Sequence, residues 1–150
     1  MSYEEIAEEL AALLDGETDS LANVSNAVAA IFHGLPDLSW AGVYCLRGEE
    51  LVLGPFQGRP ACVRIPVGQG VCGTAAAQLR STLVADVAAF PGHIACDPAS
   101  RSELVVPIIA GGHLVGVLDL DSPRPARFTL ADQSGCERFA VLVAPFLARL

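Results

Sequence analysis

The run LVVPIIAGGHLVGVLDLD, residues 104–121, decides how this chain of 150 residues folds. Two apolar, strand-forming segments flank Gly111-Gly112, which predicts a β-hairpin closed by a tight turn. Side chains alternate along a strand, so the even-numbered positions from Leu114 to Leu120 should face one side of the sheet. The odd-numbered positions from Val115 to Asp121 should face the other side. The hairpin therefore predicts a sheet with one wholly apolar face and one face that ends in two carboxylates.

Helices are predicted at both ends of the chain, outside this hairpin. Residues of about 3–33 show helical spacing in two segments, and the second can begin at Asp19 or Ser20. A C-terminal helix of about 130–148 opens on the capping box Thr129–Asp132, and Pro145 should kink or shorten its end. The apolar stripes of the first two helices are predicted to comprise Ile6, Leu10, Leu13 and Leu14, then Leu21, Val24, Val28, Ile31 and Phe32.

Short strands and one short helix fill the middle of the chain. Strands are predicted at 40–46, 51–56, 61–66 and 82–84, and a short helix at 71–77 follows the third. The sheet and its loops thus occupy about 39–121. Helices around a mainly antiparallel sheet give an α+β fold, and we expect one domain over residues 1–150.

The composition and charge exclude several functional classes. A net charge of −8 argues against nucleic acid and anionic lipid as partners, because both would select a basic face. An apolar content of 52% supports a sizeable core without disulfides. No segment reaches the ~18 uninterrupted apolar residues that a membrane span requires. Glutamates stand where a signal peptide would carry Lys or Arg, so we expect a cytoplasmic protein.

The cysteines point to thiol chemistry rather than to a structural framework. Their number is five, an odd count, and a reducing compartment disfavours structural disulfides. Three of them, Cys62, Cys72 and Cys96, lie between residues 60 and 103. Cys96 stands between two prolines on a predicted loop, where a thiol is accessible and can be reactive. His93 is near enough in sequence to activate this thiol, but it could equally be an ordinary loop residue. Cys45 and Cys136 are interpreted as core.

No Cys-x-x-Cys pair occurs, so the spacing fits neither a zinc ribbon nor a thioredoxin motif. Zinc bound by Cys62, Cys72, Cys96 and a histidine would require the fold to bring these residues together.

Asp119 and Asp121 project in parallel from the end of the last predicted strand. They are either a solvated strand end or the wall of an acidic pocket that holds a cation or shares a proton. Glu103, just before the partner strand, could join them, and three carboxylates would suit an ammonium group. Trp40 is either a core anchor or the apolar wall of the same pocket.

Six blocks of the sequence resemble the free methionine-(R)-sulfoxide reductases, which are stand-alone GAF domains. Their order and number, nearly continuous from about residue 39 to 133, are far more specific than a short motif. The blocks are SWAGVY (39–44), LVLGPFQG (51–58), PACVRIP (60–66), GVCGTAA (70–76), FPGHIACD (90–97) and GVLDLDSP (116–123).

The resemblance implies a GAF fold and the reduction of free, not protein-bound, methionine sulfoxide. It implies that Cys96 is the catalytic cysteine, Cys62 the principal resolving cysteine and Cys72 an auxiliary thiol, with a Cys62–Cys96 disulfide in the cycle. Thioredoxin would regenerate the enzyme, and no prosthetic cofactor or metal is expected. A homodimer is also implied; the N-terminal helices could supply its interface, or their apolar stripes could pack internally. The substrate-binding residues that it implies are Trp40, Glu103, Asp119 and Asp121. The alternative is a non-catalytic GAF module that senses a small molecule.

Overall fold

The computed structural model describes residues 1–94 and 96–150. Helices occupy both ends of the chain and strands the middle, as the sequence predicts. In chain order the elements are α1 (Tyr3–Leu14), α2 (Ser20–Gly34), β1 (Trp40–Arg47), β2 (Glu50–Gln57), β3 (Arg64–Pro66), α3 (Gly70–Gln78), β4 (Thr82–Val84), a 3-10 turn (Val87–Ala89), β5 (Ser102–Ala110), β6 (His113–Ser122) and α4 (Leu130–Leu147).

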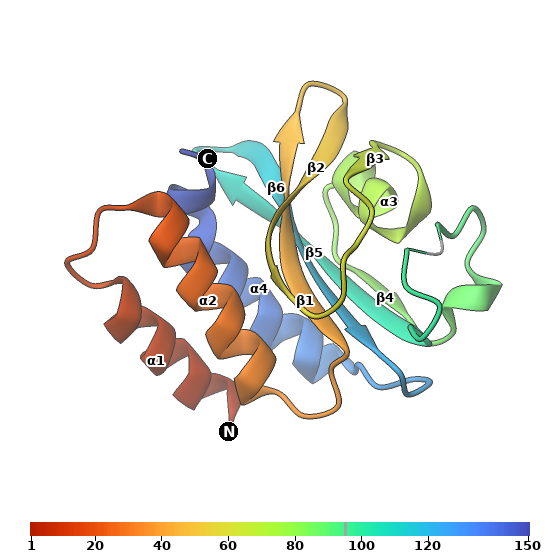
Figure 1. Ribbon diagram of the computed structural model, residues 1–150, viewed down its shortest axis with the longest axis horizontal. Coiled ribbons are helices and arrows are strands. Elements are labelled where there is room, and N and C mark those ends of the chain that lie inside the picture. The colour runs from red at the N-terminus through yellow and green to blue at the C-terminus, as the bar shows by residue number, and fades with distance from the viewer. Residues whose placement is uncertain (95) are drawn as a thin grey trace.

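The strands form one antiparallel sheet with the order β3-β2-β1-β6-β5-β4. Helices α1, α2 and α4 cover one face of the sheet, and α3 with the loops on either side of it covers the other (Figure 1). The predicted α+β fold is confirmed. The central strands β1 and β6 are therefore buried on both faces, and whatever they carry is held rigidly.

Each face of the sheet has its own hydrophobic core. On the helix side, Leu118 and Leu120 of β6 pack with residues of α1, α2 and α4, and Phe139 of α4 is fully buried there. On the α3 side, Val117 of β6 and Trp40 of β1 belong to one buried cluster. The two cores share only the sheet, so the chemistry of one face is separated from the other by a layer of backbone.

The β5–β6 hairpin shows one departure from strict alternation. Ile108 pairs with Gly116, but Ile109 pairs with Leu114, so β6 has an extra residue between these pairs. Leu114 consequently packs on the α3 side and Val115 on the helix side, opposite to the prediction. Such a bulge reverses the facing of the residues beyond it. From Gly116 to Asp121 the predicted alternation holds.

Thr129 opens α4 with the predicted capping box, and Asp19, one of the two predicted starts, caps α2. A further capping box at Ser2 opens α1. The predicted apolar stripes are wrong at two positions, because Leu13 is 40% exposed and Leu21 is 57% exposed. Buried alanines, Ala7 in α1 and Ala27 in α2, shift the inward face away from these leucines.

Pro145 does not shorten α4, which continues to Leu147. Proline lacks the N–H that would bond the carbonyl four residues earlier. That carbonyl belongs to Val141, a residue 72% exposed, where water can bond it instead.

The predicted third strand is also shorter than expected. β3 covers only Arg64–Pro66, so Cys62 lies in the loop before it rather than on a strand. The carbonyl of Cys62 accepts a hydrogen bond from the Tyr44 hydroxyl, and the carbonyl of Val63 accepts one from the Leu53 backbone N–H. The backbone near Cys62 is thus held partly by a side chain instead of by a strand ladder.

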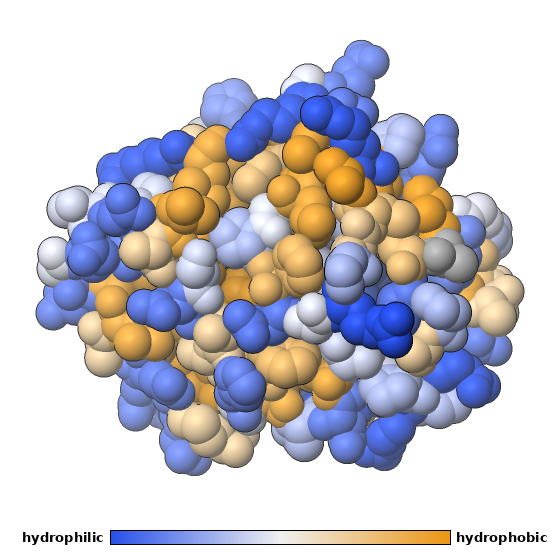
Figure 2. All heavy atoms as spheres, in the orientation of Figure 1, coloured by the Kyte–Doolittle hydropathy of each residue, from blue (hydrophilic) through white to orange (hydrophobic). Residues whose placement is uncertain are grey.

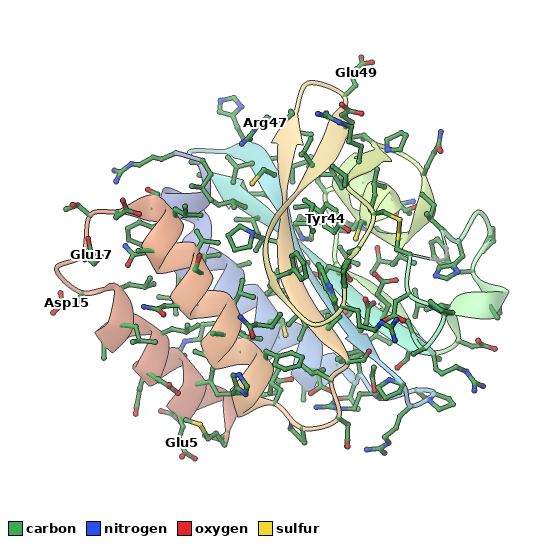
Figure 3. The ribbon with its side chains drawn as sticks, in the orientation of Figure 1. Glu5, Asp15, Glu17, Tyr44, Arg47 and Glu49 are labelled. Carbon is green, nitrogen blue, oxygen red and sulfur yellow. A yellow bond between two sulfur atoms is a disulfide. The ribbon has the colours of Figure 1, made fainter. Side chains whose placement is uncertain are left out.

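Of the helices in the described parts of the chain, none has both the length and the apolar character needed to cross a bilayer. The face that carries α1 and α2 mixes hydrophilic and hydrophobic residues, and hydrophilic ones gather at the tip of the β1–β2 hairpin (Figure 2). Arg47 and Glu49 mark that tip in Figure 3, while Tyr44 of the same strand lies over the middle of the sheet.

Candidate active site

Strand register brings the predicted pocket residues together on the α3 face. Trp40 of β1 pairs with Asp121 of β6, and Asp121 pairs in turn with Glu103 of β5. These three residues therefore form one row across three strands. Asp119 lies two positions along β6, on the same face of the sheet.

A pocket opens above this row, roofed by α3 and by the loops that precede and follow it. Tyr44, His93, Ser100 and Asp97 also contribute to its wall. The predicted site residues that line it are Trp40, Cys72, Cys96, Glu103, Asp119 and Asp121. Cys62, the remaining one, is joined to it through a disulfide to Cys96. The chain thus gathers in one place residues that are up to 81 positions apart, from Trp40 to Asp121.

The Cys62–Cys96 disulfide links the loop between β2 and β3 to the loop that precedes β5. The two Cα atoms are 5.4 Å apart, a normal span for such a bond. Figure 3 shows the bond in yellow, beside α3. The pairing is the one that the family resemblance implies; within the block 90–97, Ala95 lies outside the described residues.

The carboxyl groups of Glu103, Asp119 and Asp121 are buried, with exposed fractions of 7%, 5% and 9%. Among the residues that the structure describes around this pocket there is no Lys or Arg to neutralise them. The prediction of a solvated strand end is therefore excluded, and the acidic wall is confirmed.

Burial and mutual repulsion control the protonation of this cluster. Burial raises the pKa of Glu103 well above its usual value, and the charges of Asp119 and Asp121 add to the effect. The pKa of Asp121 is likewise raised well above its usual range, by burial and then by Asp119. Burial also raises the pKa of Asp119. In the described residues Oδ1 of Asp119 is buried without a hydrogen-bond partner. Protons or an external cation are thus needed to stabilise the cluster.

Cys72 is the third residue of α3, and its thiol faces the same carboxylates. Its Sγ lies 3.9 Å from Oε2 of Glu103, to which it donates a weak hydrogen bond. Burial, then the charges of Asp119 and Glu103, raises the pKa of the Cys72 thiol well above its usual value. A thiol held protonated in this way is a poor nucleophile, which separates Cys72 from the disulfide pair.

Trp40 serves both roles that the sequence left open. It is only 2% exposed, yet its ring forms part of the pocket wall. The ring stacks on Phe56 at 5.4 Å and on Tyr44 at 6.1 Å between centroids. Sequence reasoning missed Tyr44, although it is on the same face of β1 as Trp40, four residues along the strand.

Two other cysteines are confirmed as core residues. Cys45 is 4% exposed and Cys136 is fully buried, both on the helix side of the sheet.

The zinc arrangement predicted as an alternative does not fit this state, because Cys62 and Cys96 are bonded to each other. Ligand atoms of Cys72, Glu103 and Asp119 lie within 4.8 Å of one another. Among the described residues, these three groups lie close enough together to hold a metal ion.

Comparisons with known proteins place this arrangement in a family. The GAF domain family matches residues 3–147. The free methionine-R-sulfoxide reductase of Escherichia coli (strain K12) is 47% identical over 146 residues, spanning 97% of this chain and 88% of that one. The structure of free methionine-R-sulfoxide reductase from Neisseria meningitidis in complex with its substrate superposes with a TM-score of 0.93 at 40% identity, covering 98% of this chain and 90% of that one. The chain belongs to the free methionine-R-sulfoxide reductase family.

Members of this reductase family share their fold with proteins of other kinds. The GAF domain of a phosphoenolpyruvate-protein phosphotransferase from Coxiella burnetii superposes with a TM-score of 0.89 over 99% of this chain and 94% of that one, at 19% identity. At that identity the likeness is one of fold alone. The site itself is described by this chain's own residues: a pocket lined by Cys96, which is disulfide-bonded to Cys62, and by three buried carboxyl groups.

Proposed function

We propose that this chain reduces free methionine-(R)-sulfoxide to methionine, with Cys96 as the attacking thiol. The observation that carries the proposal is the position of the Cys62–Cys96 pair at a pocket whose floor is three buried, unneutralised carboxyl groups. An oxidisable sulfur pair supplies the two electrons of a reduction, and the carboxyl cluster selects a small cation. The relatives named above as reductases support the reaction class.

Recognition of the substrate follows from charge. Glu103, Asp119 and Asp121 would hold the ammonium of a free amino acid, which brings the positive charge that the pocket lacks. A methionine sulfoxide residue inside a polypeptide has an amide in place of this ammonium. The cluster therefore favours the free amino acid, and Trp40 would provide the apolar wall for the methyl end of the substrate.

The reaction requires two successive transfers at sulfur. The Cys96 sulfur attacks the sulfoxide sulfur, the oxygen passes to Cys96 as a sulfenic acid, and methionine leaves two electrons richer. A proton must reach the departing oxygen, and a carboxyl group of the cluster with a raised pKa can donate it. Cys62 then attacks the sulfenic sulfur, so that an S–S bond forms, the S–O bond breaks and the oxygen leaves as water.

The disulfide must be reopened before another turnover. We propose that a thioredoxin dithiol does this by exchange, in the cytoplasm, without a prosthetic group. Cys72 would remain a protonated auxiliary thiol beside the substrate. Dimerisation through the N-terminal helices is part of the same proposal, and light scattering at micromolar concentration tests it.

Purified protein, incubated with free methionine-(R)-sulfoxide and dithiothreitol and followed by chromatography, tests the function. We expect multiple turnovers to methionine with the R epimer and none with the S epimer. Tight binding of the amino acid without product would instead indicate a sensor module.

A further inference from the structure

The loop that carries Cys62 is held to the sheet through its carbonyl oxygens. The indole Nε1 of Trp40 donates to the carbonyl of Arg59 at 3.0 Å, and the hydroxyl of Tyr44 donates to the carbonyl of Cys62 at 3.0 Å. The bond from Tyr44 is the one that fixes the cysteine itself.

Tyr44 is well suited to hold another residue in place. It lies on β1, which pairs with β2 on one side and β6 on the other. Its side chain is 2% exposed and stacks against Trp40 at 6.1 Å. The ring therefore cannot move without disturbing the centre of the sheet, and the position of its hydroxyl is fixed by the fold.

The hydroxyl also remains a donor over the working pH range. Burial, and then the negative charge of Asp119, raises the pKa of Tyr44 far above its usual value. Because the phenol does not ionise, the hydrogen bond to the Cys62 carbonyl persists while the carboxyl cluster exchanges protons.

We propose that Tyr44 is a positioning residue for the disulfide-forming step, holding the main chain of Cys62 within reach of Cys96. This inference rests on the proposed reductase function and assigns different residues to its two chemical steps. Attack on the substrate involves Cys96 and the carboxyl cluster, whereas closure of the disulfide also depends on where the β2–β3 loop is held.

The consequence is confined to one half of the cycle. When the hydroxyl is absent, the Cys62 thiol samples more positions and meets the Cys96 sulfenic acid less often. The same atoms are exchanged as before: the S–S bond forms, the S–O bond breaks, and water leaves with the sulfenic proton and the thiol proton. The sulfenic acid simply persists for longer and is open to further oxidation.

The test compares Tyr44→Phe with Tyr3→Phe in single-turnover experiments on the reduced protein. Both substitutions remove a tyrosine hydroxyl that makes a hydrogen bond, but Tyr3 bonds Asp132 on the opposite face of the sheet. Rapid quenching measures methionine release, mass spectrometry measures disulfide formation, and dimedone traps the sulfenic acid.

We expect Tyr44→Phe to release one equivalent of methionine, and the rate of this release is the internal reference for the disulfide step, because Tyr44 also lines the pocket. Disulfide formation should slow by about fivefold to tenfold, the equivalent of one hydrogen bond, and the dimedone adduct on Cys96 should accumulate. Tyr3→Phe should form its disulfide at the parent rate.

Unchanged disulfide formation in Tyr44→Phe would overturn the proposal, as would a loss confined to methionine release, which would make Tyr44 a substrate contact instead. Equilibration of the variant with a glutathione redox buffer provides a second measurement that does not depend on catalysis. The concentration of oxidised glutathione divided by the square of the reduced concentration, at the point where half of the protein carries the Cys62–Cys96 disulfide, should be about fivefold to tenfold higher than in the parent. If the parent protein formed no methionine, the proposed function itself would be refuted. This outcome differs from unchanged disulfide formation in Tyr44→Phe, which would refute only the role of Tyr44.

Discussion

Two buried carboxyl groups on opposite faces of the sheet have similar burial and opposite chemistry. Asp132, on the helix side, is 8% exposed, and Asp119, in the pocket, is 5% exposed. Asp132 accepts hydrogen bonds from Tyr3, from Arg127 at 3.2 Å and from the backbone N–H of Thr129 at 2.7 Å. Oδ1 of Asp119 has no partner among the described residues.

The pKa values express the same difference. Burial acts to raise the pKa of Asp132, but the hydrogen bonds from Tyr3 and Thr129 and the charge of Arg127 lower it below its usual value. Burial raises the pKa of Asp119, and among the described residues no side-chain cation forms an ion pair with it. One face uses a buried carboxylate to hold helices together, whereas the other keeps its carboxyl groups ready for an external cation.

Substitution of a cysteine on each face of the sheet should give the largest difference in enzymatic activity. Cys96→Ser should abolish methionine formation, because a hydroxyl cannot take up the sulfoxide oxygen as a sulfenic acid does. Cys136→Ser should retain turnover and lose about 1–3 kcal/mol of unfolding free energy, since it places a hydroxyl in the fully buried helix-side core. Chromatography of methionine and chemical denaturation measure the two effects; sustained turnover by Cys96→Ser would contradict the account.

The next largest effects are expected for Asp119→Asn and Asp132→Asn, which make the same isosteric change on opposite faces of the sheet. Asp119→Asn should raise the KM for methionine-(R)-sulfoxide by about 10-fold to 100-fold, the equivalent of a charged hydrogen bond, while stability stays equal or rises. Asp132→Asn should leave KM within about twofold and cost about 2–3 kcal/mol of unfolding free energy, because the partly buried Arg127 loses its charged partner. Steady-state kinetics and denaturant unfolding of both variants measure KM and the unfolding free energy. A loss of stability in both variants would contradict the proposed difference between the two faces.

Stability should depend on pH in opposite directions for the two sites, with smaller effects. The folded protein retains protons on Glu103 and Asp121 that the unfolded chain releases above pH ~4. The unfolding free energy therefore falls as pH rises from about 4 through their raised pKa values. Asp132 contributes stability above pH ~4 that is lost as pH falls through its lowered pKa.

Thermal unfolding of Glu103→Gln at a series of pH values tests the first of these effects. The fall in Tm as pH rises above about 4 should be shallower than in the parent protein. One proton over one pH unit is about 1.4 kcal/mol, or roughly 3–6 °C in Tm for a chain of this length. Asp132→Asn serves as the control, because it should leave the fall at higher pH unchanged. Parallel profiles for Glu103→Gln and the parent protein would mean that the pocket carboxyl groups are not held protonated.

The hairpin at 104–121 predicted part of the acidic wall of the pocket, because alternation alone places Asp119 and Asp121 on one face. The bulge near Leu114 was not predictable, since nothing in that run of small and apolar residues indicates which strand carries the extra position. Leu13 and Leu21 were placed wrongly because the spacing of large residues gives no weight to buried alanines. The disulfide pairing came from the family resemblance, not from cysteine spacing. The hydrogen bond from Tyr44 depends on how a loop folds back over β1, which no local pattern encodes.

Calorimetric titration of Cys96→Ser with two ligands tests most directly whether the carboxyl cluster recognises the ammonium. Free methionine-(R)-sulfoxide and its N-acetyl derivative differ at this group and share the sulfoxide. The account predicts that the free amino acid binds at least about tenfold more tightly, and that Asp119→Asn in the same background reduces this preference. Equal affinity for the two ligands would contradict the central claim.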